Sequence, residues 1–243
     1  MVDPKRLQLL ISTAASMGLE PEQVKDLGLI SIVVAGKKHY LFHKVSNPNS
    51  QMSSWLAENK SVSRIIFEQN SLPNIPFLYP VTLADTEKFL EEHGKIIVKP
   101  VKGKHSEDIH LISDRKDLSQ LDLTERIAEK FIKGQEIRLL VVDYQVKAVH
   151  LKVYESDINN PALVNRISLE RDQWDKALVD KAIKAAKALG LVFTAVDFLL
   201  TQDGNAYILE INSAPGLEFF QEPTKGPAFD AMRAYLELVV RSL

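Results

Sequence analysis

The segment that carries most of the chemistry is an apolar strand interrupted by two polar side chains. In "AYILEIN", residues 206–212, Glu210 and Asn212 stand among residues suited to a sheet interior. Just upstream, Asp203-Gly204 is a strong signal for a two-residue β-hairpin loop. With that loop, Asp197 on the preceding strand faces Glu210, and Asn212 projects from the same face because strand side chains alternate. We therefore expect two carboxylates and an amide to converge on one point.

Two carboxylates that face each other across a strand pair need a cation between them, because opposed like charges destabilise the pairing. Carboxylate and amide oxygens suit magnesium, or manganese in its place, with phosphate oxygens completing the coordination. The alternative is an exposed face whose acids are merely solvated. Against it, both faces of the hairpin look covered: Ala195 and Ile208 are expected on the polar face, and Val196, Phe198, Leu209 and Ile211 on the other. A three-residue loop would shift the register by one and undo the pairing.

The composition narrows the class of protein. The chain has 243 residues, a net charge of -2 and no cysteine, and 45% of its residues are hydrophobic. Length and composition predict a globular protein of one large or two small domains. The charge gives no argument for nucleic acid or an anionic membrane as partner, and the absent cysteines exclude disulfides, thiolate catalysis and cysteine-based zinc sites. No stretch matches a membrane span, and the N-terminus resembles an amphipathic helix more than a signal peptide, so we expect a cytoplasmic protein.

The elements that would position the polar cluster predict an α+β class, because strands meet mostly by hairpins and helices are grouped between them. The expected strand pairs are a hairpin over 29–44 around Ala35-Gly36, a turn near Asp143-Tyr144 and the hairpin over 193–212. The expected helices cover 49–70, 84–94 and 171–190, followed by a final helix with Phe229, Met232, Leu236, Val240 and Leu243 on its inner face. A polar stretch makes residues 115 to 127 a candidate boundary.

Three further groups add phosphate and nucleotide chemistry. Lys99 ends the apolar strand "KIIVKP", and Lys60 sits between two helical stretches. Each alone reads as a solvated lysine, but beside a magnesium site a strand-end lysine is a natural phosphate contact. In "EKFIKGQEIR", residues 129–138, Glu129 and Glu136 flank a glycine turn, although an exposed strand end would carry the same residues.

The order of "ENKSVSRIIFEQNSLPNIPFLYP", "KIIVKP", "EKFIKGQEIRLLVV", "AVDFLL" and "YILEINSAPG" resembles the ATP-grasp superfamily of carboxylate–amine ligases over about residues 50–220. Within it, the chain is similar to the ATP-grasp part of cyanophycin synthetase and to related amino-acid and glutamate ligases. The resemblance implies an ATP-grasp fold in which two α+β lobes clamp ATP. The implied division is a short N-terminal helix and hairpin segment over 1–50, an N-lobe over 51–126 and a C-lobe with the metal site over 127–243.

The resemblance also implies a role for each matched residue. The phosphates of ATP would be held by Lys60 and Lys99, and Lys152 would reach the terminal phosphate. Glu129, Lys130 and Ile132 would line the adenine edge, partly through backbone groups, and Glu136 would accept the ribose hydroxyls. Arg166 or Arg171 would hold the substrate or its acyl phosphate, and Asp197, Glu210 and Asn212 would bind magnesium. The implied activity is ATP-dependent amide formation between an amino acid or peptide and an amine.

Two departures keep other functions open. Gly103 is followed by Ser106 and Asp108 where the family's phosphate loop usually has further glycines, and His105 lies in the same loop. Only 59 residues precede Lys60, so the acceptor pocket could be reduced, lost or shared with a partner, and a homo-oligomer is worth testing. The alternatives are an ATP-binding regulatory or assembly module without ligase activity, and a small-molecule kinase on the same scaffold.

Overall fold

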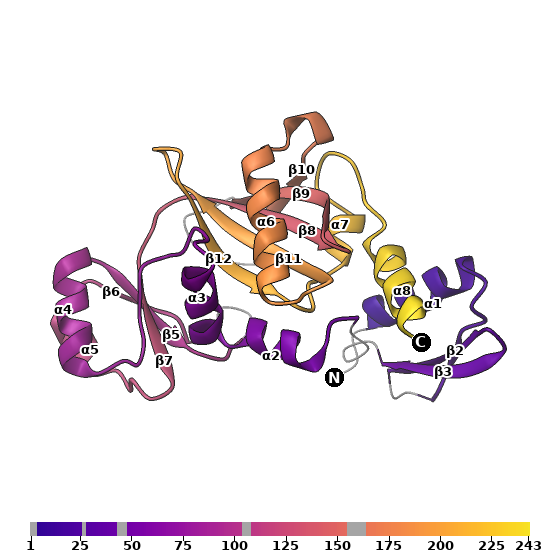
Figure 1. Cartoon of the computed structure of the whole chain (residues 1–243), viewed down its shortest axis with the longest axis horizontal. Helices are drawn as coiled ribbons and strands as arrows, with labels where there is room; N and C mark the ends of the chain where they lie inside the picture. Colours follow the sequence, from indigo (N-terminus) through magenta and orange to yellow (C-terminus); the bar gives the residue numbers. More distant parts are fainter. Residues whose placement is uncertain (1–3, 26–27, 43–47, 104–107, 155–163) are drawn as a thin grey trace.

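The computed structural model describes residues 4–25, 28–42, 48–103, 108–154 and 164–243 (Figure 1). They form three antiparallel sheets with helices packed against them, which confirms the α+β class. Figure 1 shows the sheets in a row, with the N-terminal strands at one end, the largest sheet in the middle and the smaller lobe at the other end. No helix in the described ranges is long and apolar enough to cross a membrane.

The N-terminal segment packs on the end of the chain. Its elements are α1 (Pro4–Ser16), β1 (Glu22–Gln23), β2 (Leu29–Val34) and β3 (Lys37–Phe42). Ala35 and Gly36 both have positive φ angles, as a type I′ turn requires, so the predicted hairpin is confirmed. Helix α1 shares a core with α8 (Ala231–Ser242). The inner face of α8 includes Tyr235 and Val239, whereas Leu243, expected there, is 51% exposed because the helix ends before it.

The smaller lobe is a four-stranded sheet backed by two helices. Its strands, in spatial order, are β4 (Phe77–Leu78), β7 (Arg126–Lys130), β5 (Ile96–Pro100) and β6 (His110–Ile112). The helices against it are α4 (Leu83–His93) and α5 (Arg115–Ser119). Helix α4 starts after Thr82 and ends before Gly94, close to the predicted ends. Strand β7 pairs with β4 and β5, so this sheet continues to Lys130, past the boundary expected after residue 126.

Two helices lie in the helical region expected over 49–70, which agrees with the expectation that it has two helical stretches about Lys60. They are α2 (Gln51–Glu58) and α3 (Lys60–Gln69). Asn59 separates them: its backbone is extended, and its side chain accepts a hydrogen bond from the Val62 amide. An N-cap of this kind starts a new helix. The break places Lys60 in the first turn of α3, where its amide donates to Val101 O.

The larger lobe is a five-stranded sheet covered on one face by α6 (Lys176–Ala188). Its strands, in spatial order, are β10 (Val164–Ser168), β9 (Gln145–Tyr154), β8 (Gln135–Val142), β11 (Phe193–Leu200) and β12 (Ala206–Asn212). The long helix expected over 171–190 starts instead with a short 3-10 turn, η2 (Arg171–Gln173), and Asp175 caps α6. The short helix α7 (Glu218–Gln221) and α8 cover an apolar part of the other face. The rest of that face is polar.

The hairpin of β11 and β12 reaches the predicted pairing by a different route. Its loop spans residues 201–205 rather than Asp203-Gly204 alone, and next to the loop Leu200 pairs with Ala206. This register is one residue out of step with the prediction. A β-bulge then adds Leu209 to β12, so that Asp197 faces Glu210 as expected.

The bulge corrects one further expectation. An extra residue reverses which face the following side chains occupy. Ile208 therefore does not share a face with Glu210. It packs with Ile211, Val196 and Phe198 in the core beneath α6.

Candidate active site

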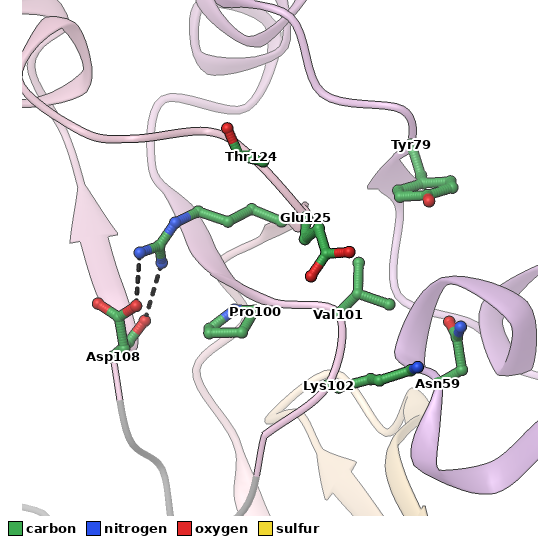
Figure 2. A pocket seen from close by; sticks show the side chains of 9 residues that line it. Asn59, Tyr79, Pro100, Val101, Lys102, Asp108, Thr124 and Glu125 are labelled. Carbon is green, nitrogen blue, oxygen red and sulfur yellow. Dashed lines mark hydrogen bonds and ion pairs between the residues drawn. The ribbon is translucent and has the colours of Figure 1, made fainter. Parts of the chain in front are cut away.

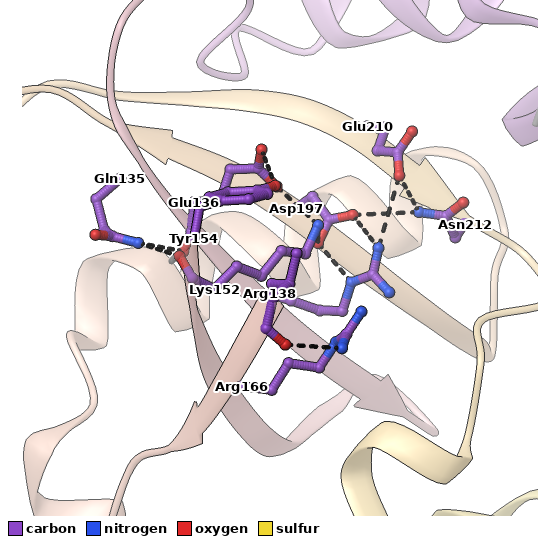
Figure 3. A network of polar contacts seen from close by, with 10 residues as sticks. Gln135, Glu136, Arg138, Lys152, Tyr154, Arg166, Asp197, Glu210 and Asn212 are labelled. Atoms are coloured by element: carbon purple, nitrogen blue, oxygen red, sulfur yellow. Dashed lines mark hydrogen bonds and ion pairs between the residues drawn. The ribbon is translucent and has the colours of Figure 1, made fainter. Parts of the chain in front are cut away.

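Asp197 is the centre of the polar face of the larger sheet. Its side chain is fully buried, and both oxygens accept from Arg138, at 2.6 Å from Nε and 2.5 Å from Nη2 (Figure 3). Lys152 Nζ lies 3.6 Å from Oδ1. Burial alone would raise the pKa of Asp197, but the Arg138 and Lys152 charges outweigh it and hold that pKa well below its usual range. Asp197 is therefore a permanent anion at neutral pH.

Glu210 and Asn212 stand beside Asp197 on β12. Glu210 Oε1 lies 2.9 Å from Asn212 Nδ2 and 3.6 Å from Arg138 Nη2. Burial, followed by the negative charge of Asp197, raises the pKa of Glu210. The predicted trio is thus brought together. Asn212 turns its amide nitrogen toward both carboxylates, at 3.4 Å from Asp197 Oδ2, so binding a cation by its oxygen would require the amide to rotate.

The side chains of Asp197, Glu210 and Asn212 are chemically suited to bind a hard cation. Two carboxylates and an amide meet on a half-open sheet face, and burial followed by the negative charge of Asp197 raises the pKa of Glu210, a cost that a bound cation would offset. In the described ranges, no cluster of three or more acidic, histidine or cysteine side chains is suited to hold a metal. A divalent ion here would therefore need oxygens from a bound phosphate as well.

Glu136 and Lys152 form the next pair on this face. They are cross-strand neighbours on β8 and β9, with Lys152 Nζ 2.8 Å from Glu136 Oε2. Tyr154 donates to Glu136 Oε1 at 2.8 Å. Burial, together with the Glu136 charge, raises the pKa of Tyr154, which keeps its hydroxyl protonated. Glu136, the expected ribose acceptor, thus lies within hydrogen-bond reach of the predicted phosphate lysine.

The two candidate arginines are separated by the structure. Arg166 pairs with Lys152 across β10 and β9 (Figure 3). Its guanidinium lies 3.6 Å from the centre of the Phe219 ring. Burial and the nearby Arg138 charge lower the pKa of Arg166. Arg171 is exposed on η2, and its guanidinium lies 5.6 Å from the centre of the Trp174 ring. Of the two, only Arg166 lies beside Lys152 and near Asp197.

The predicted phosphate lysines meet at the smaller lobe. Lys60 Nζ donates to Gly103 O at 3.0 Å, and burial followed by the Lys99 charge lowers the pKa of Lys60. Lys99 is 8% exposed, with Nζ 2.7 Å from Glu129 Oε2. Arg64 Nε lies 2.9 Å from the other Glu129 oxygen. Burial would raise the pKa of Glu129, but Arg64 and Lys99 together lower it to about 2.

The Glu129 side chain is therefore engaged with cations, and it does not point to an adenine edge. A contact of Glu129 with adenine would have to come from its backbone. The neighbouring residues of the expected adenine edge are Lys130, whose amide donates to Pro76 O, and Ile132, which is half-buried after the end of β7.

The phosphate loop is described only at its ends. Ser106 and His105 lie outside the described residues, whereas Gly103 and Asp108 lie within them. Asp108 pairs with Arg126, at 2.5 Å, and with His110, at 2.6 Å. The negative charge of Asp108 is therefore directed to these partners. In Figure 2 this pair borders a cavity of about 300 Å³ in the smaller lobe, and none of the predicted site residues lines it.

Three polar residues of the site were not predicted. Arg138 binds Asp197, Arg64 binds Glu129, and His150 lies buried between the charges of Arg138 and Arg166. Within the described part of the chain, neither ring nitrogen of His150 has a hydrogen-bond partner, and burial lowers its pKa to about 4. A signal was present in the sequence: each is a polar residue at an otherwise apolar position of a strand or helix, as Glu210 is.

The arrangement can do phosphate chemistry. Lys152, Arg138 and Arg166 lie around the pair of carboxylates that would bind a metal (Figure 3). Lys60, with Lys99 near it in the smaller lobe, is close enough to interact with the charge of Glu210. Fixed positive charges of this kind stabilise a phosphoryl group and the charge that develops as it moves. No side chain has to act as a nucleophile for such a reaction.

Known proteins share this fold and, in part, this sequence. A model of the RimK-like ATP-grasp domain matches residues 57–234. The tetrahydromethanopterin:alpha-L-glutamate ligase of Methanocaldococcus jannaschii is 27% identical over 207 residues, which cover 79% of this chain and 70% of that protein. The D-alanine–D-alanine ligase of Clostridium beijerinckii is 28% identical over 183 residues, covering 68% of this chain and 60% of that protein.

Solved structures agree on the fold. The ATP-grasp ligase PsnB complexed with a minimal precursor matches 80% of this chain and 64% of its own, with a TM-score of 0.66 and 21% identity. A bifunctional glutathione synthetase from Pasteurella multocida matches 98% of this chain but 44% of its own, with a TM-score of 0.72 and 14% identity. The chain thus spans less than two thirds of several of the proteins it matches.

These findings confirm the resemblance to ATP-grasp ligases, while the finer likeness to cyanophycin synthetase stays a prediction. The family model covers well over half of the chain. The chain therefore belongs to the RimK-like ATP-grasp family.

Proposed function

We propose that the protein is an ATP- and Mg²⁺-dependent ligase that joins the carboxylate of an amino acid or peptide to an amine. The observation that carries this proposal is the meeting of Asp197, Glu210 and Asn212 beside Lys152, in a chain of a family whose members include amino-acid ligases. The match to a D-alanine–D-alanine ligase and to an L-amino acid ligase from Bacillus licheniformis supports an amino acid or peptide as substrate.

The reaction has two balanced steps. A carboxylate oxygen of the acid attacks the γ-phosphorus of ATP, and the bond to the β-phosphate oxygen breaks to release ADP. The amine then attacks the acyl carbon, phosphate leaves, and the nitrogen loses a proton. Bound magnesium would neutralise the phosphate oxygens between the two lobes.

The chain's own residues would position the substrates and stabilise the charge on the transferred phosphoryl group. Lys60 and Lys99 would hold the phosphates from the smaller lobe, and Lys152 would face the transferred phosphoryl group from the larger sheet. Arg166 stands at the side of the same cluster, where it would orient the carboxylate or its acyl phosphate. Most of the rate gain would come from positioning and charge stabilisation.

Product analysis tests the proposal. The protein is incubated with ATP, Mg²⁺ and a panel of amino acids and peptides, and ADP, phosphate and coupled products are measured. An amide product with ADP and phosphate in equal amounts is the expected result. A phosphorylated product without an amide would indicate a kinase instead, and nucleotide binding without turnover on any pair would indicate a binding module.

The two arginines give a matched pair of variants. Arg166→Met is expected to lower kcat/KM for the acid substrate by about a hundredfold, the cost of losing one charged group at developing charge. Arg171→Met removes the same charge from an exposed turn, and we expect it to stay within about threefold of the parent. Steady-state kinetics with varied acid measures both. Equal losses in the two variants would show that Arg166 has no special place at the substrate.

A further inference from the structure

One buried guanidinium joins the two halves of the proposed site. Arg64 on α3 is 2% exposed, and its donors reach groups on three other segments of the chain. They bind Glu129 on β7, Asn74 in the connection after α3, and two backbone carbonyls on β12. A buried arginine needs all its donors matched, and the rigid fork of a guanidinium can satisfy several acceptors at once.

The ion pair of Arg64 with Glu129 changes the net charge around Lys99. Glu129 is 3% exposed and lies between Arg64 Nε, at 2.9 Å, and Lys99 Nζ, at 2.7 Å. Two cations thus share one carboxylate, which leaves a surplus positive charge at Lys99. Without Arg64, Glu129 would neutralise Lys99 alone, and the attraction of Lys99 for a phosphate would fall.

The two Nη groups of Arg64 hold the β-bulge in place. Arg64 Nη1 donates to Ile208 O at 2.5 Å, and Nη2 donates to Leu209 O at 2.8 Å. Leu209 is the extra residue that restores the pairing of Asp197 with Glu210. Asn74 braces this contact, because it accepts from Arg64 Nη1 at 3.1 Å and donates to the Arg64 carbonyl at 2.8 Å.

We propose that Arg64 is a positioning residue that couples the phosphate lysine of the smaller lobe to the metal-binding strand of the larger lobe. The inference rests on the proposed function, in that nucleotide and metal bind at these two places. By its charge, Arg64 keeps Lys99 available for phosphate. By its fork, it fixes the register that sets Glu210 opposite Asp197.

Two variants separate the effect of the Arg64 charge from the effect of its contacts with the β12 carbonyls. Arg64→Met removes both the charge and the fork, whereas Arg64→Lys keeps a charge beside Glu129 but cannot span two carbonyls and a carboxylate. Arg241→Met is the matched control, since Arg241 is 61% exposed and its described contacts are an ion pair with Asp143 and a hydrogen bond to the Glu237 carbonyl in its own helix. Calorimetry measures the Kd of ADP with EDTA and then with Mg²⁺, and thermal unfolding checks the folded fraction.

The two Arg64 variants are expected to differ in how they bind ADP. Arg64→Met raises the metal-free Kd for ADP by about tenfold, the loss of one charge-assisted phosphate contact. Arg64→Lys keeps that Kd within about threefold, but the gain in affinity on adding Mg²⁺ falls by at least about fivefold because the bulge is no longer held. Arg241→Met changes neither quantity. Should Arg64→Met not fold, Arg64→Lys alone decides the coupling.

Failure of the inference and failure of the function are distinguishable. A folded Arg64→Lys protein whose Mg²⁺ gain equals that of the parent would overturn the coupling, since a purely structural arginine would lower stability and leave this gain unchanged. A parent protein that binds no ADP with or without Mg²⁺ would instead overturn the proposed function.

Discussion

Replacing Glu210 with glutamine is expected to lower ATP turnover by at least about a hundredfold, the typical cost of removing a group that stabilises charge in a phosphoryl-transfer site. The substitution keeps the size and the contact with Asn212 Nδ2 but removes the anion. Asp197 is left as the remaining carboxylate of the pair, and its two oxygens already accept from Arg138. Magnesium-dependent nucleotide binding should therefore be lost, which calorimetry with ADP and Mg²⁺ measures.

The control for this variant is Glu237→Gln on the exposed face of α8, which removes the same charge at a distance from the cluster. We expect it to retain parental binding. Unchanged magnesium-dependent binding in Glu210→Gln would reject the metal site itself, whichever reaction the protein catalyses.

The second large effect is on stability. Glu129→Ala is expected to lower the free energy of unfolding by about 3–5 kcal/mol, because it strands the buried cations Arg64 and Lys99 without their shared carboxylate. Urea unfolding at pH 7 measures the difference. Glu22→Ala is the matched control: Glu22 pairs with Lys38 at the same 2.9 Å, but both side chains are more than half exposed. We expect little change in stability from it, because solvent screens an exposed ion pair.

The pH dependence of this difference has a definite sign. The folded pKa of Glu129 is about 2, below the ordinary value of 4.5 for an unfolded glutamate. Its contribution to stability is therefore fully present above pH 4.5 and is lost as the pH falls from there toward 2. The gap in unfolding free energy between the parent and Glu129→Ala should narrow as the pH falls from 4.5 toward 2. A gap that stays constant or widens on acidification would contradict the assigned ion pair.

The sequence predicted the pairing of Asp197 with Glu210 through two errors that cancel. Asp203-Gly204 suggested a two-residue loop, the observed loop is longer, and the bulge at Leu209 compensates. A signal for the bulge was available: Ile208 and Ile211 lie three residues apart, whereas residues on one face of a regular strand are separated by two. Their common core beneath α6 explains this spacing.

Other parts of the site could not be predicted, because they depend on contacts between distant segments. The choice between Arg166 and Arg171 depends on strand pairing, since only β10 places an arginine beside Lys152. The ion pair of the Glu129 side chain could not be predicted either, because its partner Arg64 lies 65 residues away in sequence. The surface hairpins, by contrast, follow from local turn residues such as Ala35-Gly36, whose preferences need no tertiary context.

The bulge at Leu209 also separates the register of the Asp197–Glu210 pair from that of the hairpin tip. Upstream of the bulge, the strand ends and the loop at 201–205 follow one register, and downstream the carboxylates follow another. The tip is exposed and held by local hydrogen bonds such as that from the Thr201 amide to Asn205 O. Substitutions in this loop, and short peptides grafted there, would therefore leave the position of Glu210 unchanged. The hairpin tip is thus a natural attachment point for a probe or an added domain that leaves the proposed site intact.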